Sequence, residues 1–233
     1  MTRGQPGLTV YLLLHGRRVV VIGGGKVAAG KVEKLLAAGA DVTVVAPALG
    51  SDLARQSDAG RVHWLARSFE PADVAAAWFV VAATGSPTVD ASVFAACEAH
   101  RVWCNAADIP AACSAYWMAQ RQAGDAVVAA GTGGAAPGLA GRIADEAMLG
   151  LPADLAGLVD HYAQARASVL AAALGDGAEV HVRNRALRRL ARQPWATLRA
   201  EPAQLTETVL ADIGDRLAPP DGPGGGGDPA ASR

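Results

Sequence analysis

The sequence predicts an α/β fold, a parallel and doubly wound sheet followed by a helical domain. Apolar β-branched runs alternate with helical patterns through the first half of the chain. A glycine-rich turn joins the first of these runs to the first helix. From Pro137 onward the pattern is helical. Strand, helix and strand in repeated succession are typical of a parallel sheet with right-handed crossovers.

The first helix is the best defined element of the sheet domain. It is expected over residues 27–38, where Ala28, Val32 and Leu35 share one face. Gly39 follows at the position of a left-handed C-cap. A second helix is expected over residues 86–100, with Ser86 at the N-cap and a proline in the first turn. The expected strands are residues 17–24, 41–47, 62–66, 78–84 and 102–106.

The pattern changes after residue 108. "SAYWMA" and "AVVAAGT" are short extended runs joined by "QRQAGD", which favours a hairpin or a small extension of the sheet. Helices are expected over residues 137–149, 153–174, 181–193 and 202–217. The last residues, 218–233, are rich in glycine and proline and are expected to form a disordered tail.

Composition excludes several classes of protein. The chain has 233 residues and a formal net charge of −1, which argues against a nucleic-acid partner. No apolar run approaches the roughly 20 residues needed to cross a bilayer, so no membrane partner is expected. Three cysteines form no paired framework, which favours a reducing, cytoplasmic setting. The histidines are scattered, and no bound metal is expected.

A dinucleotide fingerprint follows the first strand. In "VVIGGGKVAAGK", Gly23, Gly25 and Ala28 stand at the G-x-G-x-x-G/A spacing. Such glycines permit a tight turn and a close approach of the backbone to a pyrophosphate, at the start of a helix. The alternative is an ordinary glycine-rich turn between strand and helix. The acidic residue that usually binds a ribose about 20 positions later is missing, so the sequence does not separate NAD from NADP.

Asn105 and Asp108 follow the strand "VWCNA". In a doubly wound sheet, ligands bind at the carboxyl ends of the strands. A carboxylate there could take a proton as a hydride leaves a substrate. The alternative is that Asp108 caps the turn around Pro110, as aspartate often does. The residues themselves leave both readings open.

A second glycine-rich turn leads into the helical half. It contains Thr132, Gly133 and Gly134, and Arg142 follows in the next helix. Free N–H groups at the start of a helix, with an arginine close by, favour a site for an anion such as a carboxylate. The alternative is a flexible connection between domains.

These motifs, in this order, resemble the sirohaem-synthase amino-terminal family. The resemblance rests on "GRRVVVIGGGKVAAGKV", "CNAAD" and "GTGGAAPGLAGRI", and it covers residues 8 to 150 well. It implies a Rossmann-like, NAD-binding domain at 1–112 and a dimerisation and substrate-cleft segment at 113–150. A helical domain at 151–217 and the tail at 218–233 would follow. It also implies a homodimer.

The resemblance implies roles for individual residues. Asp108 matches the general base of the family. The expected cofactor-binding residues are Gly23, Gly24, Gly25, Lys26, Val27, Pro47, Thr84 and Asn105. The expected substrate-binding residues are Thr132, Gly133, Gly134, Arg121 and Arg142.

The function implied is NAD-dependent oxidation of precorrin-2 to sirohydrochlorin. Members of the family also insert iron(II) into that product, which makes iron a further expected substrate rather than a resident metal. One alternative is a non-catalytic protein of the same fold that binds NAD(H) or a tetrapyrrole. Another is an unrelated Rossmann oxidoreductase that acts on a smaller substrate.

Overall fold

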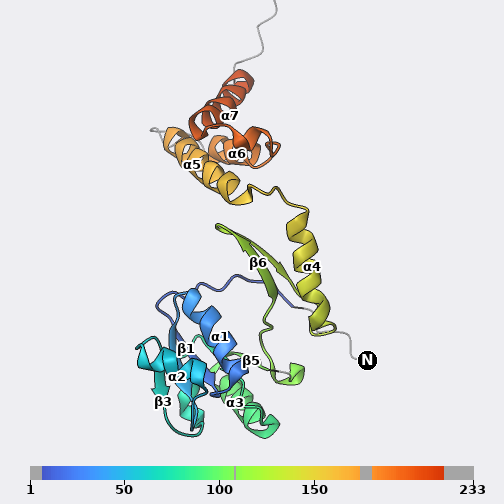
Figure 1. Ribbon diagram of the computed structural model, residues 1–233. Helices are drawn as coiled ribbons and strands as arrows, with labels where there is room; N and C mark the ends of the chain where they lie inside the picture. The colour runs from blue at the N-terminus through green and yellow to red at the C-terminus, as the bar shows by residue number, and fades with distance from the viewer. Residues whose placement is uncertain (1–6, 108, 174–179, 218–233) are drawn as a thin grey trace, which may run out of the picture. The chain divides into compact units, whose positions relative to one another are not determined.

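The computed structural model describes residues 7–107, 109–173 and 180–217. The chain divides into two compact units (Figure 1). The sheet unit contains residues 1–119 and 130–141, and the helical unit contains residues 120–129 and 142–233. The domain boundaries expected at residues 112 and 150 stay a prediction, and the expected tail lies outside the described residues.

A five-stranded parallel sheet forms the centre of the sheet unit. Its order is β3-β2-β1-β4-β5. The strands are β1 (Arg18–Ile22), β2 (Asp41–Val45), β3 (His63–Leu65), β4 (Phe79–Ala82) and β5 (Trp103–Ala106). Val21 of β1 lies opposite Val44 of β2 and Val81 of β4, and all three are fully buried. A central strand buried on both faces explains the unbroken β-branched run in the sequence.

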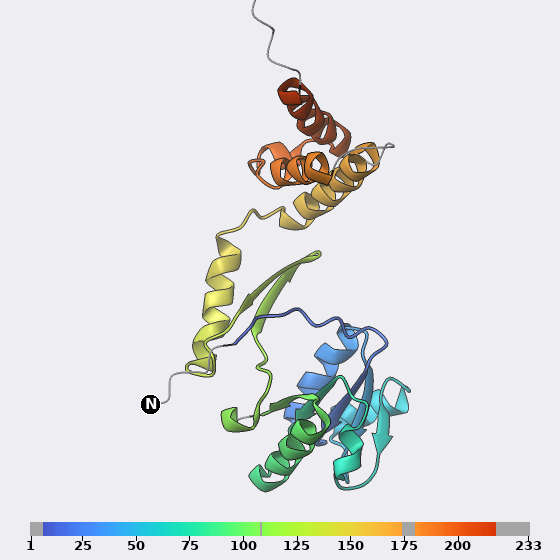
Figure 2. The same cartoon turned by 180° about the vertical axis from the view of Figure 1, so that it is seen from behind.

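Helices cover both faces of this sheet (Figure 2). α1 (Lys26–Ala37) and α2 (Ser51–Asp58) pack on one face, and α3 (Pro87–His100) packs on the other with the short 3₁₀ helix η1 (Pro71–Val74). Layers on both faces of a parallel sheet define the doubly wound class. The predicted fold class is confirmed.

The helices expected from the sequence are present, with ends shifted by up to three residues. Gly39 follows the C-cap of α1, Ala38, and has φ +72°, as the left-handed residue at a helix end requires. α2 was not expected, because it is short and mostly polar and Leu53 is its only buried residue. Ser86 occupies the N-cap of α3, but its side chain makes no capping hydrogen bond.

The second strand of the hairpin lies where it was expected, but the first strand lies further along the chain. The hairpin consists of β6 (Ala119–Ala123) and β7 (Ala126–Ala130), and Gly124 turns between them with φ +56°. The chain first passes η2 (Pro110–Ala112) and returns beside β5, where Ser114 and Ala115 donate backbone hydrogen bonds to the Cys104 carbonyl. The start of "SAYWMA" therefore lies beside β5, as a small extension of the sheet would, and only its last residue, Ala119, belongs to the hairpin.

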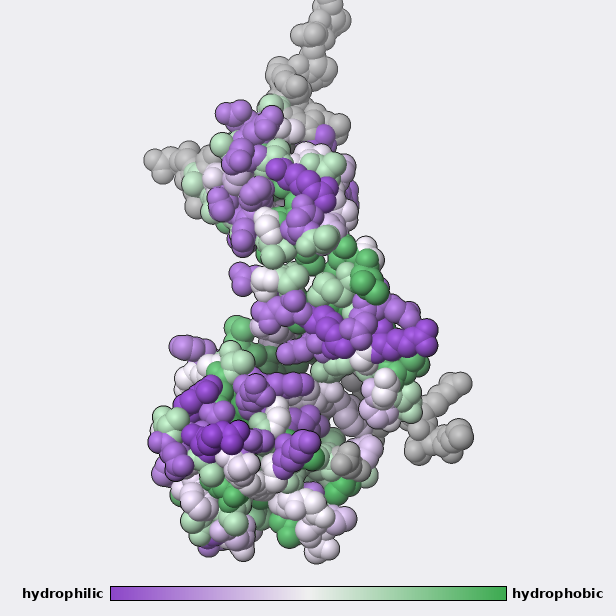
Figure 3. Space-filling model, in the orientation of Figure 1, coloured by the Kyte–Doolittle hydropathy of each residue, from purple (hydrophilic) through white to green (hydrophobic). Residues whose placement is uncertain are grey.

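The helical unit has a small core of its own. α5 (Leu155–Ala173), α6 (Val180–Leu190) and α7 (Pro202–Leu217) bury aliphatic side chains against one another, together with η3 (Thr197–Arg199). α4 (Pro137–Leu149) begins in the sheet unit and continues into the helical unit. Hydrophilic residues cover much of the helical unit in Figure 3, and the exposed Arg185 and Arg188 lie on α6. Within the described ranges, no helix is long and apolar enough to span a membrane.

Candidate nucleotide site

A cavity of about 460 Å³ opens at the carboxyl edge of the sheet. Its walls come from the segments that follow β1, β2, β3 and β4. They are Ile22, Gly23, Gly24, Gly25, Val45, Ala46, Pro47, Ala48, Leu49, Gly50, Ser68, Phe69, Thr84 and Val89. The strand order reverses beside β1, with β2 on one side and β4 on the other. Ligands of doubly wound sheets bind at this switch point.

The three glycines after β1 serve different purposes. A Cβ on Gly23 would lie 2.2 Å from the Ala83 carbonyl oxygen, and a Cβ on Gly24 would lie 2.0 Å from that of Ala48. These two glycines therefore let the turn pack against the neighbouring loops. A Cβ on Gly25 would meet nothing within 4 Å. The space in front of Gly25 is open for a ligand.

The start of α1 is prepared for an anion. Gly25 is its N-cap and supplies no side-chain hydrogen bond, and the first turn carries no acidic residue. The first N–H groups of a helix have no partner within the helix, and they carry the positive end of its dipole. The open space at Gly25 and these N–H groups together fit the pyrophosphate of a dinucleotide.

The wall after β2 is apolar. Pro47 and Leu49 line the cavity there, and no carboxylate is among the lining residues. The indole Nε1 of Trp64 donates a hydrogen bond of 2.9 Å to the Ala46 carbonyl, which holds the end of β2 in place. A ribose at this wall would be recognised by shape and by backbone groups, without the usual acidic side chain.

A buried carboxylate organises the turn after β4. Asp90 is 3% exposed and accepts hydrogen bonds from the Thr84 hydroxyl at 2.7 Å and the Thr84 backbone N–H at 3.2 Å. The Thr84 hydroxyl in turn accepts a hydrogen bond from the Ser86 N–H at 3.1 Å. Asp90 therefore fixes Thr84 at the rim of the cavity.

The structure brings five of the eight predicted cofactor-binding residues to the cavity wall, namely Gly23, Gly24, Gly25, Pro47 and Thr84. Lys26 and Val27 are exposed in the first turn of α1. Asn105 is buried, and its side-chain amide donates to the Ala115 carbonyl at 3.0 Å and to the Cys113 sulfur at 3.7 Å. In this arrangement Asn105 ties the returning chain to β5, and its contact with a cofactor stays a prediction.

The predicted base, Asp108, lies outside the described residues, whereas the turn that is predicted to bind the substrate is described. Thr132 accepts a hydrogen bond of 3.0 Å from the Ala136 N–H and so closes the turn before α4. Gly133 and Gly134 have φ of +60° and +82°, a conformation that favours glycine. The second glycine motif is thus a tight turn capped by Thr132.

Both predicted substrate arginines already pair with carboxylates in the helical unit. Arg121 of β6 binds Asp145 of α4 in a two-pronged pair at 2.6 and 2.8 Å. This hydrogen bonding lowers the pKa of Asp145 and raises the pKa of Arg121. Arg142 binds Glu146 at 2.7 Å one turn along α4. Exposed pairs of this kind are weak, and binding of a substrate by either arginine stays a prediction.

Sequence reasoning missed the wall that follows β3. Ser68 and Phe69 line the cavity, although no motif marks them in the sequence. The expectation of a strand at "VHWLA" could have pointed to them, because all parallel strands of one sheet end at the same edge. Among the described residues, no three or more His, Cys, Asp or Glu side chains gather in a way that could hold a metal ion.

Comparisons with known proteins agree with this geometry. The family described as "Putative NAD(P)-binding" matches residues 10–119. Siroheme synthase 1 of Aeromonas salmonicida is 33% identical over 207 residues, which are 88% of this chain and 44% of the relative. Siroheme synthase 1 of Pectobacterium atrosepticum is 38% identical over 148 residues, 64% of this chain and 31% of the relative.

A solved structure shares the fold. The precorrin-2 dehydrogenase SirC superposes with a TM-score of 0.68 at 20% identity, over 88% of this chain and all of that one (100%). At this identity the likeness concerns the fold alone.

The fold and the cavity define a dinucleotide-binding domain of the NAD(P) class, and the prediction of an NAD-type cofactor is confirmed. Within that class, the sequence is similar to siroheme synthases over 64% to 88% of its length, in agreement with the resemblance to the sirohaem-synthase amino-terminal family. It spans under half the length of the curated relatives it matches, 44% and 31% of the two described above.

Proposed function

We propose that this protein oxidises precorrin-2 to sirohydrochlorin with NAD as the hydride acceptor. One observation carries the proposal: a dinucleotide cavity at the switch point of the sheet, in a chain 33% identical to a siroheme synthase over 207 residues. The alternative of an unrelated oxidoreductase loses support, because the similarity to siroheme synthases extends well beyond the Rossmann domain.

The residues of the cavity would hold the cofactor in a defined orientation. The N–H groups at the start of α1 would bind the pyrophosphate, and Gly25 would let it approach the backbone. Thr84, fixed by Asp90, would stand at the rim near the nicotinamide end. NAD bound there supplies the acceptor for a hydride from the substrate.

Oxidation of the macrocycle also releases a proton, and a base must receive it. We propose Asp108, two residues after the end of β5 in the sequence, for this role. A carboxylate close to the reacting carbon can accept the proton as the hydride leaves. The several carboxylates of precorrin-2 would be received by the Thr132 turn and by Arg121 and Arg142, after exchange of their present partners.

A direct assay tests the proposal. Purified protein is mixed with precorrin-2 and NAD, and formation of NADH and of the sirohydrochlorin absorbance are followed together. We expect both signals to rise in equal amounts. Tight binding of precorrin-2 with no NADH formed would instead favour the non-catalytic binding protein. Addition of iron(II) to the same mixture tests iron insertion, which stays a prediction.

We also propose that two copies of the chain form the working unit. Apolar side chains of the segment before β1 are largely exposed, with Leu8 at 89% and Tyr11 at 73%. On α4, Leu149 is 84% exposed. A second copy would cover such surfaces, which single soluble chains seldom leave open. The domain boundaries at 112 and 150, with 113–150 as the dimerisation segment, belong to this proposal, as does a cytoplasmic location.

The molar mass in solution checks the homodimer. Light scattering after size-exclusion chromatography should give about twice the chain mass of 23.6 kDa. Replacing Leu8 and Tyr11 by serine should shift the protein toward the monomer. A monomeric unchanged protein at micromolar concentration would contradict the proposal.

A further inference from the structure

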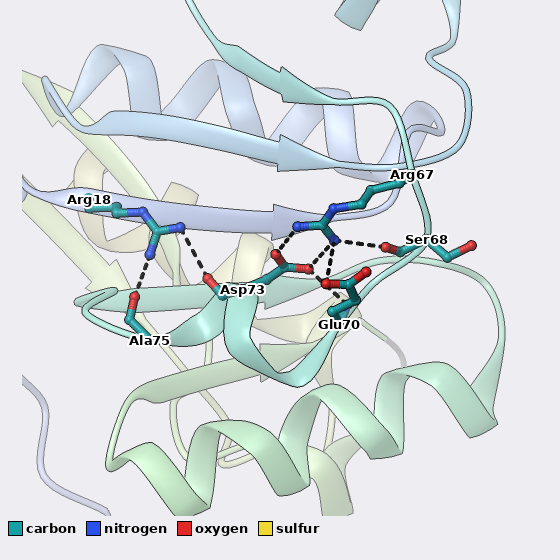
Figure 4. A network of polar contacts seen from close by, with 6 residues as sticks. All are labelled: Arg18, Arg67, Ser68, Glu70, Asp73 and Ala75. Carbon is teal, nitrogen blue, oxygen red and sulfur yellow. Dashed lines mark hydrogen bonds and ion pairs between the residues drawn. The ribbon is translucent and has the colours of Figure 1, made fainter.

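The wall formed by Ser68 and Phe69 belongs to a loop that is held by ion pairs. β3 ends at Leu65, and the loop leads from there to η1. Arg67, directly before the wall residues, reaches toward Asp73 of η1 (Figure 4). Arg67 is not among the residues that line the cavity. Any effect of this pair on the wall is therefore indirect and acts through the backbone of the loop.

The pair between Arg67 and Asp73 has the geometry of a clamp. One guanidinium nitrogen donates to Asp73 Oδ2 at 2.8 Å and the other donates to Oδ1 at 2.5 Å. The first nitrogen also donates to the Ser68 carbonyl at 3.0 Å. A two-pronged arginine–carboxylate pair fixes orientation as well as distance. Arg67 therefore holds the backbone of a wall residue directly.

Asp73 is itself anchored on three sides. Its side chain is 5% exposed and also accepts a hydrogen bond of 2.8 Å from the Glu70 N–H, which closes the start of η1. Its carbonyl accepts a hydrogen bond of 3.1 Å from Arg18 of β1, and Arg18 also donates to the Ala75 carbonyl (Figure 4). The clamp thus connects the wall of the cavity to the central strand.

The charges of the clamp persist at neutral pH. The hydrogen bond from Arg67 lowers the pKa of Asp73, and the same hydrogen bond raises the pKa of Arg67. A carboxylate with a lowered pKa contributes its stability above its unfolded pKa and loses it as the pH falls through the folded value. Asp73 is therefore ionised throughout the range in which an oxidoreductase assay is run.

We propose that Asp73 is a positioning residue for the dinucleotide, acting through Arg67 on the Ser68–Phe69 wall. The inference rests on the proposed role of the cavity as the dinucleotide site. Asp73 itself does not line the cavity, so its effect is on the shape of the wall. Without the clamp the loop would sample several positions, and the nucleotide would have to select one of them.

Calorimetric titration of the full chain with NAD, without substrate, tests this proposal at pH 7.5. Asp73→Asn keeps the volume of the side chain and removes its charge. We expect its Kd for NAD to rise about tenfold. Arg67→Lys keeps the charge but loses the two-pronged geometry, and we expect an intermediate rise. The matched control is Asp154→Asn, which breaks a similar two-pronged pair with Arg199 in the helical unit and should leave the Kd unchanged.

The titration is made at a temperature at which circular dichroism shows every variant fully folded. A purely structural role would lower the melting temperature of Asp73→Asn and leave its Kd at the level of the unchanged protein, which would overturn the proposal. If Asp73→Asn does not fold, the partly exposed Arg67 is replaced instead. An unchanged Kd for NAD in both Arg67→Lys and Arg67→Gln would then overturn the proposal. NAD binding with no turnover of precorrin-2 would overturn the proposed function alone.

Discussion

Asp108→Asn is expected to lower the rate of precorrin-2 oxidation by about 10²–10⁴-fold, the range that a placed base typically contributes. Asparagine has nearly the same shape but cannot accept the proton. The Kd for NAD should not change, because the residues that we expect to bind the pyrophosphate follow β1 and not β5. Single-turnover measurement of NADH formation separates the chemical step from product release.

This substitution also distinguishes the two readings of Asp108. Asparagine caps turns about as well as aspartate does, so a residue that only closes the turn around Pro110 would tolerate it. The control is Asp41→Asn, which removes an exposed carboxylate at the start of β2, the end of the strand remote from the cavity. Turnover of Asp108→Asn at the rate of this control would exclude the base role.

Gly23→Ala is expected to abolish measurable NAD binding and to destabilise the sheet unit by about 3 kcal/mol. The φ of Gly23 is +125°, which alanine rarely adopts. Its Cβ would also lie 2.2 Å from the Ala83 carbonyl oxygen and 2.7 Å from the Ala83 carbonyl carbon. These are backbone atoms, so the whole turn must move. Chemical denaturation and calorimetric titration measure the two effects.

Gly25→Ala is the matched comparison. Gly25 has φ −85° and free space where the added methyl group would lie, so alanine should fold without strain. We expect unchanged stability and weaker NAD binding, because the methyl group would occupy the space in front of α1. If Gly25→Ala binds NAD as tightly as the unchanged protein, the pyrophosphate does not lie at this turn.

The regular elements with a strong local signal were predictable. The buried β-branched run of β1 and the apolar face of α1 each carry one periodicity over enough residues to be read directly. α2 was missed because it buries a single leucine, and its position depends on packing against the sheet. The first hairpin strand was placed too early because "SAYWMA" is apolar for a different reason: Trp117 packs against Phe79, with ring centroids 5.8 Å apart.

In the candidate site, too, some residues could be predicted from the sequence and others could not. The glycines after β1 are recognisable because their spacing reflects a backbone requirement that holds wherever the motif occurs. Asn105 was expected at the cofactor, yet its amide is taken by a neighbouring segment of chain. Arg121 and Arg142 were expected to be open to anions, yet Asp145 and Glu146 pair with them. Glu146 lies four residues after Arg142 on one helix, so that pair could have been read from the sequence. The partners of Asn105 and Arg121 lie 10 and 24 residues away, and no local pattern records their proximity.

For this protein, the strands of the parallel sheet, the helices with an apolar face, the nucleotide turn and the family resemblance were all determined by local sequence, since each depends on short-range periodicity or on the spacing of motifs. Only the tertiary structure decided which loops meet at the cavity and which side chains hold them there. The cavity wall is the clearest case: Gly25 follows β1, Ser68 follows β3 and Thr84 follows β4, and a parallel sheet brings the ends of separate strands to one edge, whatever their distance in sequence.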